Sequence, residues 1–216
     1  MKYKIDCHPG YSYLEVELDT TDSISSEAGA MAWMDPEIEM ETSTRGGVFK
    51  GLKRALLSGE SFFQNTYTTK TSGARLSLAP GPAGAILARE MQGEELFLQK
   101  GAYLASIGDI DINSKFDGLR GFFNEGLFVL RCSGTGTLFF NAYGDIQEVE
   151  VDGEYLVDNG HFIPPDTDQS VEVTVLEGGV SNLTILVKTP PQSLVVKQSL
   201  GKLNVRGEWL ADHARI

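Results

Sequence analysis

The feature that most constrains the fold of this 216-residue chain is the alternation of apolar and polar side chains in many short stretches. A period of two is typical of β-strands that bury one face. The clearest examples are TYTTKTSGARLSLAP, LFVLRCSGTGTLFFNAYG and QEVEVDGEYLVDNG. We expect Ser-Gly turns at residues 72–73 and 133–134, and an Asp-Gly hairpin turn at residues 152–153. Strands of typical length predict an all-β protein with about fifteen to twenty strands.

Helical periodicity is scarce. The best candidate is VFKGLKRALL at residues 48–57, where apolar side chains recur on one face over at most a short helix. The tail at residues 208–216 is a second candidate. We therefore expect one or two short helices.

Three stretches of the chain resemble one another. In each, a glycine ends a short segment, an apolar patch follows, and an acidic turn then leads into an alternating strand. These stretches are residues 23–42, 95–114 and 154–174. They predict a single domain, residues 1–216, built from three internal β repeats in a pseudo-threefold arrangement. The repeats span residues of about 1–80, 81–150 and 151–216.

Charge and cysteine content limit the function classes. The chain has 18 basic and 30 acidic residues, a formal net charge of −12. Because nucleic-acid affinity depends on neutralising phosphates, this charge makes a nucleic-acid partner unlikely. The two cysteines form no CxxC motif, and the N-terminus has no apolar signal-peptide core. We expect a soluble, reduced, cytoplasmic protein.

A family resemblance rests on GGVFKGLKRALLSGESFFQNTY, SGARLSLAPGPAGAILA and GLFVLRCSGTGTLFFNAYGDI. These segments resemble the altered-inheritance-of-mitochondria (AIM) family of bacterial and archaeal proteins, over roughly residues 1 to 190. The resemblance implies a TRAP-like fold, with β-sandwich or barrel units like those of the trp RNA-binding attenuation protein. It also implies no established activity for prokaryotic members, and a link to inner-membrane organisation for mitochondrial ones.

Catalytic and metal-binding motifs are weak. His8, His161 and His213 stand alone, and no set of zinc ligands occurs at short spacing. Cys132 lies in an alternating run, so we interpret it as a buried small apolar residue rather than a nucleophile. The acidic pairs at residues 37/39 and 109/111 share a strand face, which we interpret as solvated. We predict no enzymatic activity, no metal and no cofactor.

The segment GGVFKGLKRALLSGESFF, residues 46–63, is unusual because it is basic in an acidic chain. Glycines of this segment recur after each repeat, so the segment is first of all an architectural connector. Its cations and apolar residues also form a short amphipathic stretch that fits an anionic membrane surface. The candidate interaction surface is Arg45, Phe49, Lys50, Leu52, Lys53, Arg54, Arg120, Phe122 and Phe123.

Three functional hypotheses follow. The first is a non-enzymatic binding or scaffold protein that self-associates through open strand edges and contacts a protein partner or a membrane surface. The second is an enzyme with a pocket between repeats, in which an acidic side chain or His161 acts. The third is nucleic-acid binding by analogy with the attenuation protein, although a fold does not carry its function with it.

Overall fold

The computed structural model describes residues 1–44, 63–113 and 129–149, and five later strands at 153–158, 162–163, 172–176, 184–189 and 193–196. These residues form sixteen β-strands and one short 3-10 helix, η1 (Lys100–Ala102), with no α-helix among them. The prediction of an all-β protein is therefore confirmed. Within the same residues, no helix is long and apolar enough to cross a membrane. The two predicted helices, at residues 48–57 and 208–216, lie outside the described residues.

The first sheet has four antiparallel strands. In spatial order these are β1 (Lys2–Asp6), β2 (Tyr13–Leu18), β7 (Ala74–Leu78) and β4 (Met31–Met34). Strand β2, YLEVEL, shows the sequence alternation directly. Its leucines and valine are fully buried on one face, whereas Tyr13, Glu15 and Glu17 lie on the other.

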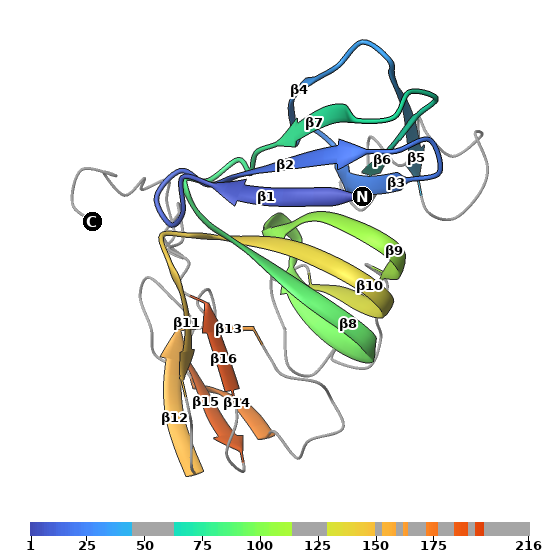
Figure 1. Cartoon of the computed structure of the whole chain (residues 1–216). Coiled ribbons are helices and arrows are strands. Elements are labelled where there is room, and N and C mark those ends of the chain that lie inside the picture. Colours follow the sequence, from blue (N-terminus) through green and yellow to red (C-terminus); the bar gives the residue numbers. More distant parts are fainter. Residues whose placement is uncertain are drawn as a thin grey trace, which may run out of the picture.

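The second sheet has six antiparallel strands. In spatial order these are β5 (Ile38–Thr44), β6 (Phe63–Thr69), β3 (Ser23–Glu27), β9 (Tyr103–Asn113), β10 (Val129–Tyr143) and β8 (Gly84–Gln99). Figure 1 shows the long strands β8, β9 and β10 curling together beneath the first sheet.

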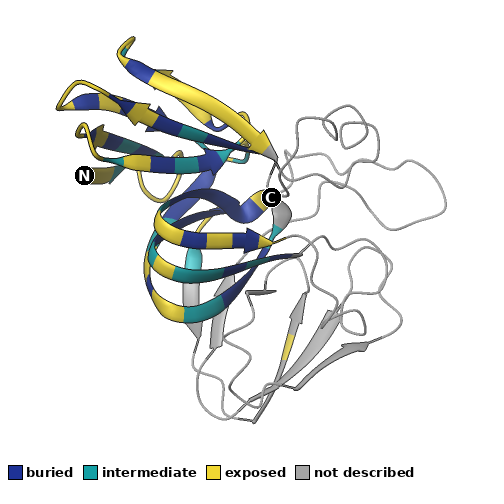
Figure 2. Cartoon of the chain, turned by 90° about the vertical axis from the view of Figure 1, so that its right-hand side faces the viewer, coloured by how far each residue is buried: buried dark blue, intermediate teal, exposed yellow. Residues whose placement is uncertain are grey.

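The two sheets pack face to face as a sandwich. One core joins the buried leucines of β2 and β7 to side chains of the second sheet, including Tyr67, Leu104 and Phe139. Figure 2 shows the buried residues alternating with exposed ones along these strands. Tyr3 on the edge strand β1 adds an edge-to-face contact with Phe139, with ring centroids 4.9 Å apart. Burying a large apolar side chain stabilises the fold by about 1.5–3 kcal/mol, so this interface holds the sheets together.

A second core lies on the opposite face of the β8–β9–β10 sheet. Consecutive residues of a strand point to opposite faces, so Phe139 belongs to the first core and Phe140 to the second. Both rings are fully buried. The curled sheet therefore has an apolar surface on each side, which explains the dense apolar sequence LFF in β10.

Two small sheets follow near the end of the chain. Their strands are β11 (Ile146–Val149), β16 (Ser193–Val196) and β13 (Phe162–Ile163), and β12 (Gly153–Asp158), β15 (Thr184–Thr189) and β14 (Glu172–Leu176). The predicted hairpin at residues 152–153 is wrong. Strand β11 pairs with β16 and β12 pairs with β15, so the two flanking strands enter different sheets.

The two Ser-Gly pairs have different outcomes. Residues 72–73 form the expected turn between β6 and β7, with Gly73 at a φ of +79°. The turn predicted at residues 133–134 is wrong, because Ser133 and Gly134 lie within the continuous strand β10. A β-bulge falls there, between Ser133 and Thr135. The pattern Gly-x-Gly at residues 134–136 suggested a turn. In the structure, these glycines instead allow the backbone of β10 to lie close to the backbone of β9.

The first two predicted repeat stretches contain different elements. The first stretch holds β3, β4 and β5, whereas the second holds the end of β8, η1 and the single long strand β9. The single-domain, three-repeat organisation and its TRAP-like character stay predictions.

A first prediction concerns Gly134, whose φ is +124° and whose added Cβ would lie 2.1 Å from the Asp109 carbonyl oxygen of β9. We expect Gly134→Ala to lower the free energy of unfolding by at least about 1–3 kcal/mol, since strain and a backbone clash both oppose the methyl group. Urea unfolding measures this. Gly10→Ala is the matched control, because that Cβ would meet nothing within 4 Å. Equal stability of the two variants would contradict the proposed close approach.

Candidate functional site

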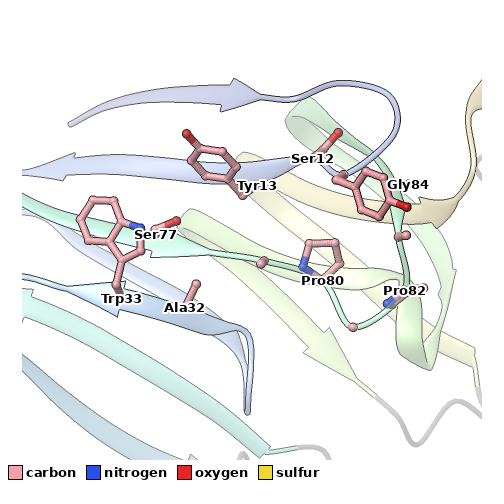
Figure 3. A pocket seen from close by; sticks show the side chains of 12 residues that line it. Ser12, Tyr13, Ala32, Trp33, Ser77, Pro80, Pro82 and Gly84 are labelled. Carbon is pink, nitrogen blue, oxygen red and sulfur yellow. The ribbon is translucent and has the colours of Figure 1, made fainter.

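The candidate site is a groove on the outer face of the first sheet. Strand β7 lies between β2 and β4, and it carries the small residue Ser77 there, paired with Trp33 of β4. Adjacent strands lie about 4.8 Å apart, so β2 and β4 are separated by about 10 Å. Small residues on the central strand, between large aromatic residues on its neighbours, leave a depression. Figure 3 shows Tyr13 and Trp33 on the two sides of Ser77.

Two loops extend the groove beyond the strands. Its volume is about 510 Å³, and its lining residues are Tyr11, Ser12, Tyr13, Ala32, Trp33, Ser77, Ala79, Pro80, Gly81, Pro82, Ala83 and Gly84. The segment from Ala79 to Ala83 leaves β7 and leads into β8, so its two prolines form one wall (Figure 3). The residues before β2 supply the other wall.

Backbone hydrogen bonds fix these loops. The Ser12 N–H donates to the Gly84 carbonyl over 3.0 Å, and the Gly144 N–H donates to the Ala83 carbonyl over 3.2 Å. Gly84 has a φ of +155°, and an added Cβ would lie 2.0 Å from the Ala142 carbonyl oxygen. Only glycine fits this crossing of three backbone segments. The positions of the loops that wall the groove are therefore set by the backbone.

The lining of the groove carries no charged residue, although 22% of the chain is charged. Asp6, which lies opposite Tyr13 on β1, is a charged neighbour of the groove. The Asp6 carboxylate contacts the Lys4 ammonium at 2.9 Å, and hydrogen bonds from Lys4 and then Tyr13 lower the pKa of Asp6. The same hydrogen bond to Asp6 raises the pKa of Tyr13, so this hydroxyl stays protonated. The groove is thus neutral at physiological pH.

The Trp33 side chain is held in position by Arg75, which in turn contacts Asp35. The Arg75 guanidinium carbon lies 5.7 Å from the centre of the Trp33 ring, within the range of a cation–π interaction. Asp35 accepts the Arg75 backbone N–H over 2.9 Å and lies 3.8 Å from the Arg75 Nε. Trp33 is nevertheless 39% exposed. It is held in place while its surface stays open.

One buried polar atom of the groove is unsatisfied. Ser12 is only 3% exposed, and its hydroxyl has no hydrogen-bond partner within the described part of the chain. Leaving a buried hydroxyl unsatisfied costs roughly 1–3 kcal/mol.

The nine residues of the predicted interaction surface all lie outside the described residues, at 45–62 and 114–128. The strands that flank them are described. Thr44 of β5 pairs with Phe63 of β6, and the first segment joins this antiparallel pair. The second segment joins β9 to its antiparallel neighbour β10. Each segment therefore connects two adjacent strands of the second sheet, and its predicted architectural role concerns residues outside the described ranges.

The two connectors leave the second sheet from opposite ends. Gln64, next to the first connector, donates a hydrogen bond to the Tyr103 hydroxyl at the start of β9, over 3.0 Å. The second connector begins after Asn113, at the far end of β9. At about 3.3 Å per residue, these points are separated by roughly 33 Å. Their contribution to a common surface stays a prediction.

The structure also describes several of the other sequence candidates. The acidic residues at 39, 109 and 111 are exposed on strands, as predicted for a solvated face, whereas Glu37 is exposed in the turn before β5. Among the described residues, no group of three or more His, Cys, Asp or Glu is placed to hold a metal ion. His8 is exposed and lies 4.0 Å from Asp145. His161 and His213 lie outside the described residues.

Cys132 is the buried small residue that its alternating context predicted, and none of its surface is exposed. Burial raises the pKa of its thiol to about 12, and the negative charge of Asp111 adds to this effect. A thiolate is the reactive form of cysteine, so this position is chemically inert.

Comparisons with known proteins identify the family of the chain. A sequence profile described as "Mitochondrial biogenesis AIM24" matches residues 3–198. The chain belongs to the AIM24 family. The predicted resemblance to the AIM family is therefore confirmed.

Two relatives of this AIM24 protein come from Streptococcus pyogenes. One is an uncharacterized protein of the serotype M6 strain, 26% identical over 193 residues, which covers 85% of this chain and 77% of that protein. The other is a protein of known crystal structure, 24% identical with a TM-score of 0.68, where the match covers 92% of this chain and 93% of that one. The second likeness supports the fold alone.

A second prediction concerns the two cysteines. In the native protein we expect a disulfide reagent at neutral pH to modify Cys7, which is exposed, and not Cys132, which is buried with a raised pKa. Both should react after unfolding in urea. As a control, the folded Cys7→Ser variant should not react. It should therefore release none of the coloured thiol that the reagent yields when it modifies a cysteine. Rapid modification of native Cys132 would contradict its placement in the core.

Proposed function

We propose that this AIM24 protein is a non-enzymatic binding or scaffold protein that holds a partner in the groove. The observation that carries the proposal is the groove itself. The groove has a volume of about 510 Å³ and an uncharged, aromatic lining, although the protein has a net charge of −12. Aromatic residues dominate binding surfaces because they supply a large rigid area at low entropic cost.

The chemistry of the lining supports binding over catalysis. Acid–base catalysis uses groups whose pKa values are brought near neutral pH. In the groove the pKa of Tyr13 moves upward, away from neutrality. The serine hydroxyls lie beside no histidine or carboxylate of the lining, so no base in the lining activates them.

We also propose that the protein is located in the cytoplasm and that it self-associates. The edge strands of the two large sheets support self-association. Among the edge strands of the two large sheets, β1 carries Lys2 and Lys4, and β5 carries acidic residues at 39 and 41. Such charges discourage edge-to-edge pairing. Strand β4, MAWM, has no charge and exposes Met31 and Trp33. Of these three edges, it is the best suited to pair with a second copy.

Contact with an anionic membrane is a second candidate function. The observation in its favour is the cluster of Lys50, Lys53 and Arg54 among apolar residues in an acidic chain. Basic residues near an anionic bilayer contribute about 1 kcal/mol each. This candidate does not involve the groove, so the two are tested separately.

A third prediction tests the groove. A benzophenone amino acid replaces the exposed groove residue Ala32 in living cells, and ultraviolet light then captures whatever lies beside it. We expect discrete covalent products that disappear when Trp33→Ala is added. The matched control places the same group at Met40, which is 45% exposed on β5. Identical products from both positions, or none from Ala32, would count against the groove as the binding surface.

A fourth prediction tests the membrane candidate by flotation with anionic and neutral vesicles. We expect binding to anionic vesicles that weakens with salt, and a loss of about a hundredfold for Lys50→Glu, Lys53→Glu and Arg54→Glu combined. The circular dichroism of the triple variant is the control for folding. Absence of flotation at low salt, or unfolding of the triple variant, would return the segment to a purely architectural role.

A further inference from the structure

We propose that the groove binds a proline-rich segment of another protein in the polyproline II conformation. This inference names the partner class for the proposed binding function, and so rests on it. Aromatic-lined grooves on small β-domains are the surfaces that recognise such segments. The lining here combines Tyr11, Tyr13 and Trp33 with the prolines at 80 and 82.

The lining of the groove suits a narrow rod. It combines the small residues Ser77 and Ala79 with aromatic residues of two different elements. Figure 3 shows Tyr13 and Trp33 on one side of Pro80, and Pro82 on the other side of it. A polyproline II helix is a narrow rod with three residues per turn. Successive proline rings can therefore stack between aromatic side chains about two strand spacings apart.

Hydrogen-bonding capacity selects the same partner. Trp33 has a donor-only indole N–H, and Figure 3 shows its nitrogen on the side of the ring toward Ser77. Proline has no N–H, and the carbonyls of polyproline II make no internal hydrogen bonds. These free acceptors can take a hydrogen bond from the Trp33 indole N–H.

Charge complementarity favours a neutral occupant. Asp6 is engaged by Lys4 and Tyr13, and Asp35 is engaged by Arg75. A lysine, arginine or carboxylate of a partner would lose water in an uncharged lining that offers it no counter-charge. Proline rings carry no charge and lose no hydrogen bond when they are buried.

Both partners are also ordered before they meet. The groove loops are fixed by backbone hydrogen bonds at Gly84 and Ala83. The polyproline II helix is preformed, so little chain entropy is lost on docking.

The experiment titrates the full-length 15N-labelled protein with decaproline. The readout is the indole N–H resonances of the protein's two tryptophans. Trp33→Phe identifies the Trp33 resonance. We expect that resonance to shift saturably with decaproline, and not with a glycine–serine peptide of equal length. Tyr11, which is 79% exposed, can be removed without loss of core packing. Tyr11→Ala should weaken binding at least tenfold, whereas Met40→Ala should leave it unchanged.

The opposite results would overturn the inference. The Trp33 resonance would then show no saturable shift at millimolar decaproline, or it would shift equally with the glycine–serine peptide. Unchanged decaproline binding by the Tyr11→Ala variant would also overturn the inference. A Trp33 shift that depends on protein concentration without peptide would assign the groove to a second copy instead. If Ala32 still captures a partner while decaproline fails to bind, the binding function stands and the partner class falls. If neither occurs, both fail.

Discussion

The burial of one face of each sheet against the other is the constraint on which the rest of the structure depends. The leucines of β2 and β7 pack on Tyr67, Leu104 and Phe139 of the second sheet. Because side chains alternate along a strand, this burial also fixes which residues face outward. Tyr13 and Trp33 reach the outer face for that reason, with Ser77 between them. The groove is thus a consequence of how the sandwich core is packed.

The outer face divides into a charged half and a neutral half. Lys2 and Lys4 pair with Glu17 and Glu15 across β1 and β2, which satisfies the charges in the same register that aligns the strands. Exposed pairs of this kind contribute little stability. Their value here is that they leave the neighbouring groove free of unpaired charge. A neutral, aromatic depression bordered by satisfied charges is suited to recognising a neutral partner.

The sequence predicted the strand class well and the groove not at all. Alternation in TYTTKTSGARLSLAP correctly predicts the buried leucines of β7, and the context of Cys132 correctly predicts its burial. The glycine at 134 was misread as a turn because close approach between β9 and β10 requires the same residue type. The groove was missed because its residues come from strands far apart in the sequence, and the order β2–β7–β4 is not visible in it. The apolar run MAWM and the prolines at 80 and 82 were the available signals.

The most direct test of the account fills the groove from its floor. Ala79 is half-buried and lines the groove, while its backbone N–H donates to the Ala30 carbonyl over 2.8 Å, a bond that a larger side chain retains. Ala79→Phe combined with the photoreactive group at Ala32 should leave the free energy of unfolding within about 0.5 kcal/mol of the parent protein. The account predicts that the captured partner then disappears. Capture of the same partner by the filled, stably folded protein would contradict it.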